Sequence, residues 1–226
     1  MSLKIKSWRK IIKWTIWSIV GILFLIFLIR VAVFEFQYYS EKEGSERAEA
    51  SIAVDTSLIE IEPTEDEVRE YKVAADRPRY LTIEKLRITN ARVLPMGVNT
   101  NGELKTPNNI FDVGWYDASG KPGYGGTMII DGHNGGPTRY GVFKELPSLA
   151  AGDIIKIERS DGEIFNYSVV ENITVPLAEA DTYMGTASVS PEMGKESVTL
   201  ITCTGEWDKN QGTYLSRQFT RAVLVE

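Results

Sequence analysis

A long series of short apolar runs separated by turn-forming residues restricts the fold of this chain more than any other feature. The runs are rich in β-branched residues, and Gly, Pro and Asn separate most of them, as in "NTNGE", "SGKPGYGG" and "HNGGPTRYG". Many short strands with turn signals between them predict an all-β barrel or sandwich. The predicted strands are 80–88, 91–98, 126–132, 153–160, 164–175, 196–203 and 217–226, with short helices over 140–149 and near 177–185.

An apolar stretch near the N-terminus carries no charge between Lys13 and Arg30. It is long enough to cross about 30 Å of hydrocarbon as a helix, and aromatic residues lie near both of its ends, as is typical of membrane interfaces. Cations precede the stretch and acids follow it, which places the N-terminus in the cytoplasm by the positive-inside rule. We expect a cytoplasmic tail over 1–10 and an uncleaved transmembrane helix over 11–34, because the core of a signal peptide is shorter, about 7–15 residues.

Residues 35–77 differ in composition from both of their neighbours. Acids greatly outnumber cations there, and few large apolar residues follow Tyr39. Such a composition is typical of a solvated spacer, with a possible helical piece near Glu65–Val73. We therefore expect an acidic extracellular linker over 35–77 and a β domain over 78–226. The net charge of −6 argues against nucleic-acid binding, which usually needs a basic face.

The only cysteine, Cys203, ends the apolar run "SVTLITC". Alternation puts Val198, Leu200 and Thr202 on one face of this strand and Thr199, Ile201 and Cys203 on the other. Turn formers then lead to a last strand near Arg217. If the two strands form an antiparallel hairpin, Cys203 and Arg217 are lateral neighbours. A lone cysteine can be inert packing or a nucleophile, and a nearby arginine favours a thiolate or an oxyanion.

The only histidine, His133, follows the apolar run "TMIID" and precedes the loop "NGGPTRYG". The junction of a strand and a loop is a common place for a catalytic group. A lone histidine in a loop is more often a surface or capping residue. One cysteine and one histidine therefore leave catalysis open when they are taken alone.

Several motifs together resemble those of sortases, the cysteine transpeptidases of bacterial surfaces. "TLITC" is similar to their TLxTC signature, "DGHNGG" to their Gly-His segment, and "RQFTRAVL" to their last catalytic strand. The resemblance covers about residues 78–226 and leans toward class F. It implies a mostly β, closed eight-stranded barrel in which Cys203 is the nucleophile, His133 the general acid/base and Arg217 the essential arginine. Arg221, which lies on the same strand face as Arg217, is then a structural residue.

The resemblance also implies a reaction. A sorting signal of the LPxTG type is cleaved between Thr and Gly, and the acyl group passes through a Cys203 thioester to an amine. That amine belongs to a peptidoglycan precursor or to a pilin lysine. The resemblance further implies that Thr202 lines the substrate groove, while the backbone N–H of Thr204 could stabilise an oxyanion.

Other features limit this interpretation. Asp131 could orient His133, although a carboxylate at a strand end is more often solvated. The acids between 175 and 197 lack the spacing of a calcium site, so we expect no metal and no cofactor. The linker lacks the Asp-Pro-aromatic lid of many pilin-polymerising class C enzymes. The segment after "ITVPL" is too short for the large extra helix of class B.

Two alternatives remain open at this point. The same residues would serve an anchored thiol peptidase that releases its substrate to water. A catalytically silent β-barrel binding module on a stalk would instead leave Cys203 inert. In that case the function would survive the substitution Cys203→Ala.

Overall fold

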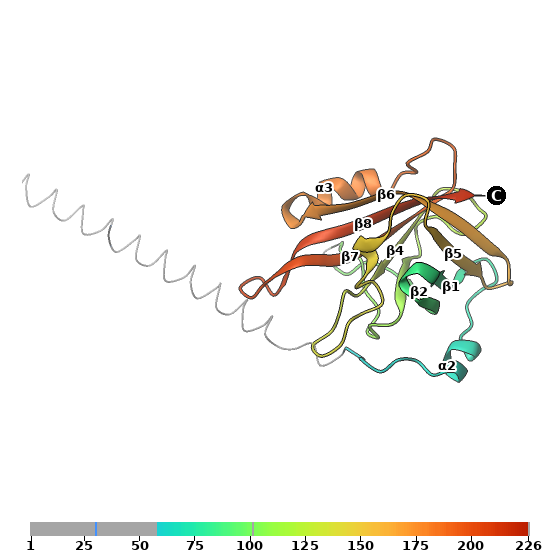
Figure 1. Cartoon of the computed structure of the whole chain (residues 1–226), viewed down its shortest axis with the longest axis horizontal. Helices are drawn as coiled ribbons and strands as arrows, with labels where there is room; N and C mark the ends of the chain where they lie inside the picture. The colour runs from blue at the N-terminus through green and yellow to red at the C-terminus, as the bar shows by residue number, and fades with distance from the viewer. Residues whose placement is uncertain (1–29, 31–57, 101, 226) are drawn as a thin grey trace, which may run out of the picture. The chain divides into compact units, whose positions relative to one another are not determined.

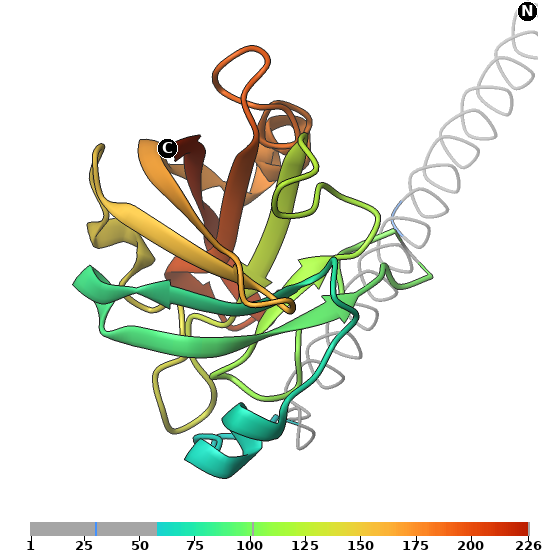
Figure 2. The same cartoon turned by 90° about the vertical axis from the view of Figure 1, so that its right-hand side faces the viewer.

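The computed structural model describes residues 30, 58–100 and 102–225. Eight strands close into a barrel in the order β1-β2-β3-β4-β7-β8-β6-β5 (Figures 1 and 2). The predicted mostly β, eight-stranded closed barrel is thereby confirmed. The strands are β1 Pro78–Ile83, β2 Ile88–Met96, β3 Val113–Tyr116, β4 Thr127–Gly132, β5 Ile154–Arg159, β6 Ile164–Pro176, β7 Ser197–Asp208 and β8 Thr213–Val225.

The predicted tail and the predicted transmembrane helix over 11–34 lie outside the described residues, apart from Arg30. No helix within the described part of the chain has both the length and the apolar character needed to cross a bilayer. The anchor therefore stays a prediction from the sequence.

The first three strands differ from the sequence-based prediction in two ways. The run 80–88 is interrupted by a 3₁₀ turn, η1 Glu84–Leu86, and Arg87 follows with a left-handed φ of 58°. This turn lets β1 fold back antiparallel on β2. The short strand β3, "VGWY", was not predicted, because four residues with a glycine among them carry little periodic signal.

The barrel has an apolar interior and a second apolar layer on its outer side. Met128, Ile130, Val198 and Leu200 belong to the interior cluster. Ile129, Ile201 and Phe219 alternate with interior positions, so they point outward, where they pack with residues of the helix α3 Leu177–Ala187. In Figure 1, α3 lies along the outer side of β6 and β8. β4 and β7 are therefore covered on both faces, which explains their nearly continuous apolar sequences.

The two predicted helices have different outcomes. The helix expected near 177–185 is α3 and is confirmed. The helix expected over 140–149 is wrong, since only the 3₁₀ turn η2 Leu146–Ser148 forms there, preceded by irregular turns. Pro147 has no N–H to donate to the carbonyl of Phe143, so a continuous α-helix could not form its normal ladder.

Part of the segment expected to be a spacer lies against the barrel. The helix α2 Glu65–Glu70 begins with a capping box between Thr64 and Glu67. Directly after this helix, the Tyr71 hydroxyl donates a hydrogen bond to the carbonyl oxygen of Val93 at 2.7 Å. Before it, the backbone of Ile59 forms an isolated parallel bridge with Asn109. The chain therefore contacts the barrel at points well before β1.

The β7–β8 hairpin is longer than the sequence predicted. Pairing resumes beyond a bulge after Thr204, and Trp207 pairs with Tyr214. Their rings meet edge-on with centroids 5.2 Å apart, an arrangement that stabilises cross-strand pairs. Cys203 therefore lies within a strand, and only residues 209–212 form the hairpin loop.

Candidate active site

Three neighbouring strands carry the candidate residues, with β7 between β4 and β8. β7 runs parallel to β4 and antiparallel to β8. Its register with β8 is continuous up to Thr204, and its register with β4 is continuous up to Asp131 opposite Ile201. Residues of the three strands therefore align in rows across the sheet. We call these the first row (His133, Cys203, Arg217), the second row (Asp131, Ile201, Phe219) and the third row (Ile129, Thr199, Arg221).

The first row contains the three residues predicted to be catalytic. Cys203 pairs directly with Arg217, as the sequence predicted. β4 ends at Gly132, and continuing its register with β7 by two residues, from Asp131 opposite Ile201, brings His133 to Cys203. All three rows face the outer side of the barrel, because Ile201 and Phe219 do so.

Arg217 is held by neutral acceptors of its own hairpin. Its guanidinium donates to the carbonyl oxygens of Tyr214 and Ser216 at 2.9 and 3.0 Å, and to the Thr213 hydroxyl at 3.2 Å. Within the described part of the chain, no carboxylate forms a salt bridge with it. The charge of Arg217 therefore stays unneutralised beside Cys203.

His133 is fixed by the backbone around it. Its Nε2 lies 2.8 Å from the carbonyl oxygen of Pro107. Its own carbonyl oxygen accepts a hydrogen bond from the N–H of Phe143 at 3.0 Å. Gly141 packs so closely that a Cβ there would lie 2.4 Å from the His133 carbonyl oxygen. The loop that follows His133 therefore needs glycine at this position.

Thr202 faces the barrel interior, together with Val198 and Leu200. Its side chain is buried, and its hydroxyl donates to the carbonyl oxygen of Gly132 at 2.8 Å. The sequence predicted that Thr202 lines the substrate groove, but the structure directs its side chain away from the outer side. The hydrogen bond ties β7 to the end of β4 directly beside the two first-row residues Cys203 and His133.

Asp131 lies in the second row, on the same strand face as His133. Its carboxylate accepts a hydrogen bond from the Thr106 hydroxyl at 2.6 Å. The other oxygen occupies the space above Gly114, where a Cβ would lie 2.5 Å from it. Burial raises the pKa of Asp131 to about 7, although the Thr106 hydrogen bond lowers it. The predicted contact with His133 stays a prediction.

The Cys203 thiol is half-buried, and its pKa is raised above the ordinary value. Burial is the largest cause, because it disfavours the thiolate. The charge of Arg217 acts in the opposite direction and lowers the pKa, while the charge of Asp131 raises it. Without a substrate, the thiol is therefore the favoured form at neutral pH.

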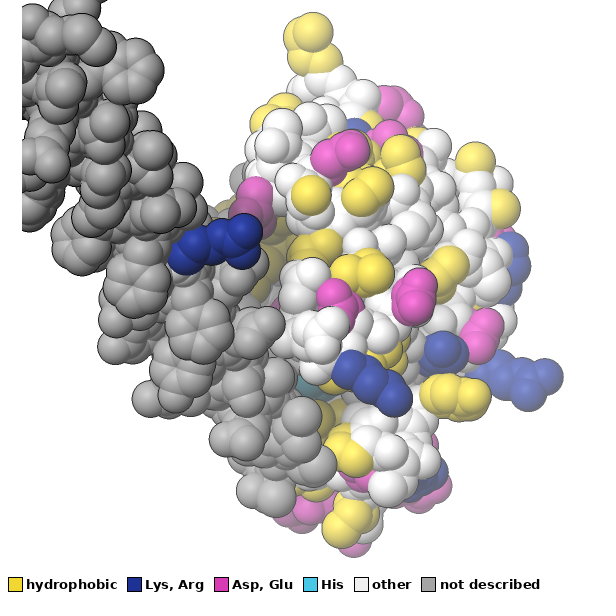
Figure 3. All heavy atoms as spheres, turned by 90° about the vertical axis from the view of Figure 1, so that its left-hand side faces the viewer, with side chains coloured by type: hydrophobic (Ala, Val, Ile, Leu, Met, Phe, Trp, Pro, Cys, Tyr) yellow, Lys and Arg dark blue, Asp and Glu magenta, His cyan; other side chains and the backbone are white. Residues whose placement is uncertain are grey.

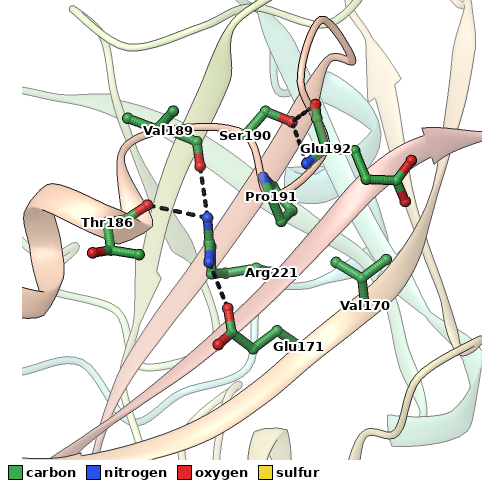
Figure 4. Close-up of a pocket in the computed structure, with 8 residues that line it drawn as sticks. All are labelled: Val170, Glu171, Thr186, Val189, Ser190, Pro191, Glu192 and Arg221. Atoms are coloured by element: carbon green, nitrogen blue, oxygen red, sulfur yellow. Dashed lines mark hydrogen bonds and ion pairs between the residues drawn. The ribbon is translucent and has the colours of Figure 1, made fainter.

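The third row anchors α3 to the barrel. Arg221 forms a salt bridge with Glu171 of β6 at 2.5 Å and donates to the carbonyl oxygens of Thr186 and Val189 at 3.1 and 2.8 Å (Figure 4). The Thr199 hydroxyl donates to the neighbouring carbonyl of Ala187 at 2.7 Å. A cation and a hydroxyl thus satisfy the carbonyl end of the helix. Glu171 and Thr199 could not be predicted from the sequence, because their partners are distant along the chain.

Figure 3 shows the face of the molecule that is on the left in Figure 1. Hydrophobic side chains lie there among charged ones of both signs. Within residues 58–100 and 102–225, no group of three or more His, Cys, Asp or Glu side chains could hold a metal ion.

Comparisons with known proteins bear on the family. No curated protein matches the chain. Among solved structures, a sortase D5 transpeptidase from Clostridium perfringens is 23% identical, with a TM-score of 0.48 over 73% of this chain and 90% of that one. Sortase C-1 from Actinomyces oris is 19% identical, with a TM-score of 0.49 over 82% and 97%. The profile of the family described as "Sortase domain" matches residues 81–225, which is more than half of the chain.

Proposed function

The chain belongs to the sortase family, and from this premise we propose that it is a membrane-anchored transpeptidase that uses Cys203, His133 and Arg217. Its donor substrate is a surface protein with an LPxTG-type sorting signal. Its acceptor is an amine of a cell-wall precursor or of a pilin. The single observation that supports this most strongly is the alignment of Cys203 with Arg217 across β7 and β8, with His133 at the end of β4.

In the first half of the reaction, the Cys203 thiol gives its proton to His133, and the sulfur attacks the carbonyl carbon of the Thr–Gly bond. A carbon–sulfur bond forms, and the carbonyl oxygen becomes an oxyanion. Arg217 lowers the free energy of this intermediate, because its charge is not already paired with a carboxylate. The carbon–nitrogen bond then breaks, and His133 gives a proton to the leaving amine.

In the second half, an acceptor amine attacks the thioester. A carbon–nitrogen bond forms and His133 takes the proton of the amine. The carbon–sulfur bond then breaks, and His133 passes this proton to the Cys203 sulfur. The product is the donor protein joined through its Thr carbonyl to the acceptor. If water replaces the amine, the same residues catalyse hydrolysis.

The hydrogen bond of His133 holds its ring in place. A carbonyl oxygen only accepts hydrogen bonds, so Nε2 carries the hydrogen that it shares with Pro107. This bond orients the imidazole during both halves of the reaction.

Thr202 and Thr204 support the first row in different ways. We assign Thr202 a positioning role through its hydrogen bond with Gly132. Thr204 follows the nucleophile, and its backbone N–H is the proposed second donor to the oxyanion. The proposed membrane anchor over 11–34 would place the barrel on the outer side of the cell membrane.

The experiment that tests this function uses the full-length chain in detergent micelles. The chain is incubated with a Leu-Pro-Xaa-Thr-Gly peptide and triglycine, and the products are identified by mass. We expect a product in which Thr is joined to triglycine, and we expect its loss in Cys203→Ala, His133→Ala and Arg217→Ala. Lys156→Gln, on β5, is the control that keeps the product.

The other outcomes separate the alternatives. A cleaved acid without the triglycine product would favour a thiol peptidase. A product that persists in Cys203→Ala would exclude the nucleophile proposed here. An intact peptide with every variant, over a panel of sorting motifs, would favour a silent binding module.

A further inference from the structure

A cavity with a volume of about 540 Å³ lies beside the first row. It is lined by the loop 134–140, by Lys144 and by Tyr214. The loop begins directly after His133, and the carbonyl oxygen of Tyr214 accepts a hydrogen bond from Arg217. The cavity is therefore connected by covalent bonds or hydrogen bonds to both ends of the first row.

The cavity and α3 lie on opposite sides of the first row. Along β4 and into its loop, Asp131 precedes His133 and the cavity residues follow it. Along β8, Tyr214 precedes Arg217, whereas Phe219 and its contact with α3 follow it. A thioester on Cys203 thus has the α3 side and the cavity side as two distinct approaches.

The cavity is cationic. Its lining contains Arg139 and Lys144 and no acidic side chain. Arg139 lies over the ring of Phe111 and Lys144 over the ring of Tyr140, each at 5.0 Å from the centroid. Within residues 58–100 and 102–225, neither cation forms a salt bridge. The Lys144 charge is therefore available to an anionic ligand, whereas Arg139 donates to the Glu60 carbonyl oxygen at 3.1 Å and its charge also acts on the Glu60 carboxylate.

The loop that lines the cavity is preformed. The N–H of Gly141 donates to the carbonyl oxygen of Asn134 at 2.8 Å, which closes the loop. Glu60 lies against the loop, where its carboxylate accepts a hydrogen bond from the Thr138 N–H at 2.9 Å. A Cβ at Gly136 would lie 2.0 Å from this carboxylate. The Glu60 charge is thus bound by loop donors, outside the lining, and it holds the loop in place.

We propose that this cavity binds the acceptor substrate, and that the acceptor is an amine carried by a molecule with carboxylate groups. The two cations attract the carboxylates, while the amine extends to Cys203 in the first row. Tyr140 and Tyr214 add hydroxyl groups and ring surface to the same lining. This inference rests on the proposed transpeptidase function. It favours a carboxylate-bearing cell-wall peptide over a lysine on a neutral or basic protein surface.

The test uses two acceptors that share the amine and differ in charge. Gly-Gly-Gly-Asp-Asp is compared with Gly-Gly-Gly-Asn-Asn, both amidated at the C-terminus, in the full-length chain. The concentration of acceptor that gives half-maximal transfer is measured together with the consumption of the donor peptide. We expect the anionic acceptor to need a lower concentration, by about threefold for each cation, and we expect salt to reduce this preference.

Variants locate the effect. Lys144→Gln should remove about half of the preference for the anionic acceptor on a logarithmic scale. Lys144→Glu should reduce this preference further than Lys144→Gln does, and Lys144→Arg should retain it. Lys156→Gln is the matched control. Lys156, on β5, pairs with Glu84 of η1, so this variant should keep the full preference. Consumption of the donor peptide in the absence of acceptor should be unchanged in Lys156→Gln.

A binding measurement separates this inference from the proposed function. Ligand-observed NMR with the Cys203→Ala chain should show tighter binding of the anionic acceptor, and Lys144→Gln should weaken it. Equal binding of the two acceptors, or a preference for the neutral one, would overturn the cavity assignment. Preferential binding without any transfer by the wild-type chain would overturn the transpeptidase function and leave the cavity assignment standing.

Discussion

Arg217 and Arg221 lie four residues apart on β8, face the same side of the barrel and have opposite surroundings. Arg221 is buried, pairs with Glu171 and satisfies two carbonyl oxygens at the end of α3. Arg217 is half-buried and is bonded to two carbonyl oxygens and a hydroxyl. The charge of Arg221 is neutralised by a carboxylate, whereas the charge of Arg217 is oriented and left unpaired.

The difference shows how one strand face provides both structure and chemistry. A buried, paired arginine holds two elements together, because removing it leaves its partners without donors. An oriented arginine without a carboxylate can stabilise negative charge that develops during a reaction, with little rearrangement. The role of each arginine therefore follows from the acceptors that surround it as well as from its position relative to Cys203.

The same substitution at both positions tests this comparison, and Arg217→Met should have the larger effect. We expect the transfer rate to fall about 100-fold or more, because the charge beside the oxyanion is lost. The free energy of unfolding should change by less than about 1 kcal/mol, since the lost partners are partly solvated carbonyls. Transfer kinetics and urea unfolding measure the two quantities. A large loss of stability together with a small loss of rate would contradict the assignment.

Arg221→Met should show the reverse pattern. We expect the free energy of unfolding to fall by about 2 kcal/mol, less than for a fully buried ion pair because Glu171 is partly exposed. The transfer rate, measured where the variant is folded, should change by less than about tenfold, through looser positioning of α3. The double variant with Glu171→Gln should recover part of the stability. An Arg221→Met chain that is stable and inactive would make Arg221 the catalytic arginine.

Asp131→Asn should have the smallest effect of the three substitutions. It tests whether the charge of Asp131 acts on the pKa of Cys203. Asp131 is charged above its pKa of about 7, and its charge raises the pKa of Cys203. Its removal should lower the pKa of Cys203 and shift the pH profile of iodoacetamide alkylation toward lower pH. The alkylation rate at pH 8 should therefore increase. An unchanged profile, or a shift toward higher pH, would show that Asp131 does not act on the thiol.

The pairing of Cys203 with Arg217 in the first row could be predicted from the sequence, because the signals for it are local. Alternation in "SVTLITC" assigned Cys203 to the face of Thr199 and Ile201, and the turn formers after it indicated a hairpin that returns at Arg217. The register between β7 and β8 confirms this pairing. The parallel register of β4 with β7 could not be read in the same way, because no turn connects these two strands.

Contacts between distant segments account for the features that the sequence did not predict. The hydrogen bond from Thr202 joins β7 to Gly132 at the end of β4, and the third row depends on Glu171 and on the end of α3. The contact of Glu60 with the loop after His133 lies in a segment whose composition suggested only a solvated spacer. Such contacts leave no periodic pattern in the sequence around either partner.

The central claim is that Cys203 forms a thioester with the donor peptide, and the mass of the intact protein tests it most directly. The full-length chain is mixed with donor peptide, quenched in acid during turnover and analysed by mass spectrometry. We predict an added mass equal to the donor up to its Thr carbonyl, located at Cys203 and absent in Cys203→Ala. A consumed peptide with no adduct at Cys203, or an equal adduct in Cys203→Ala, would contradict the account.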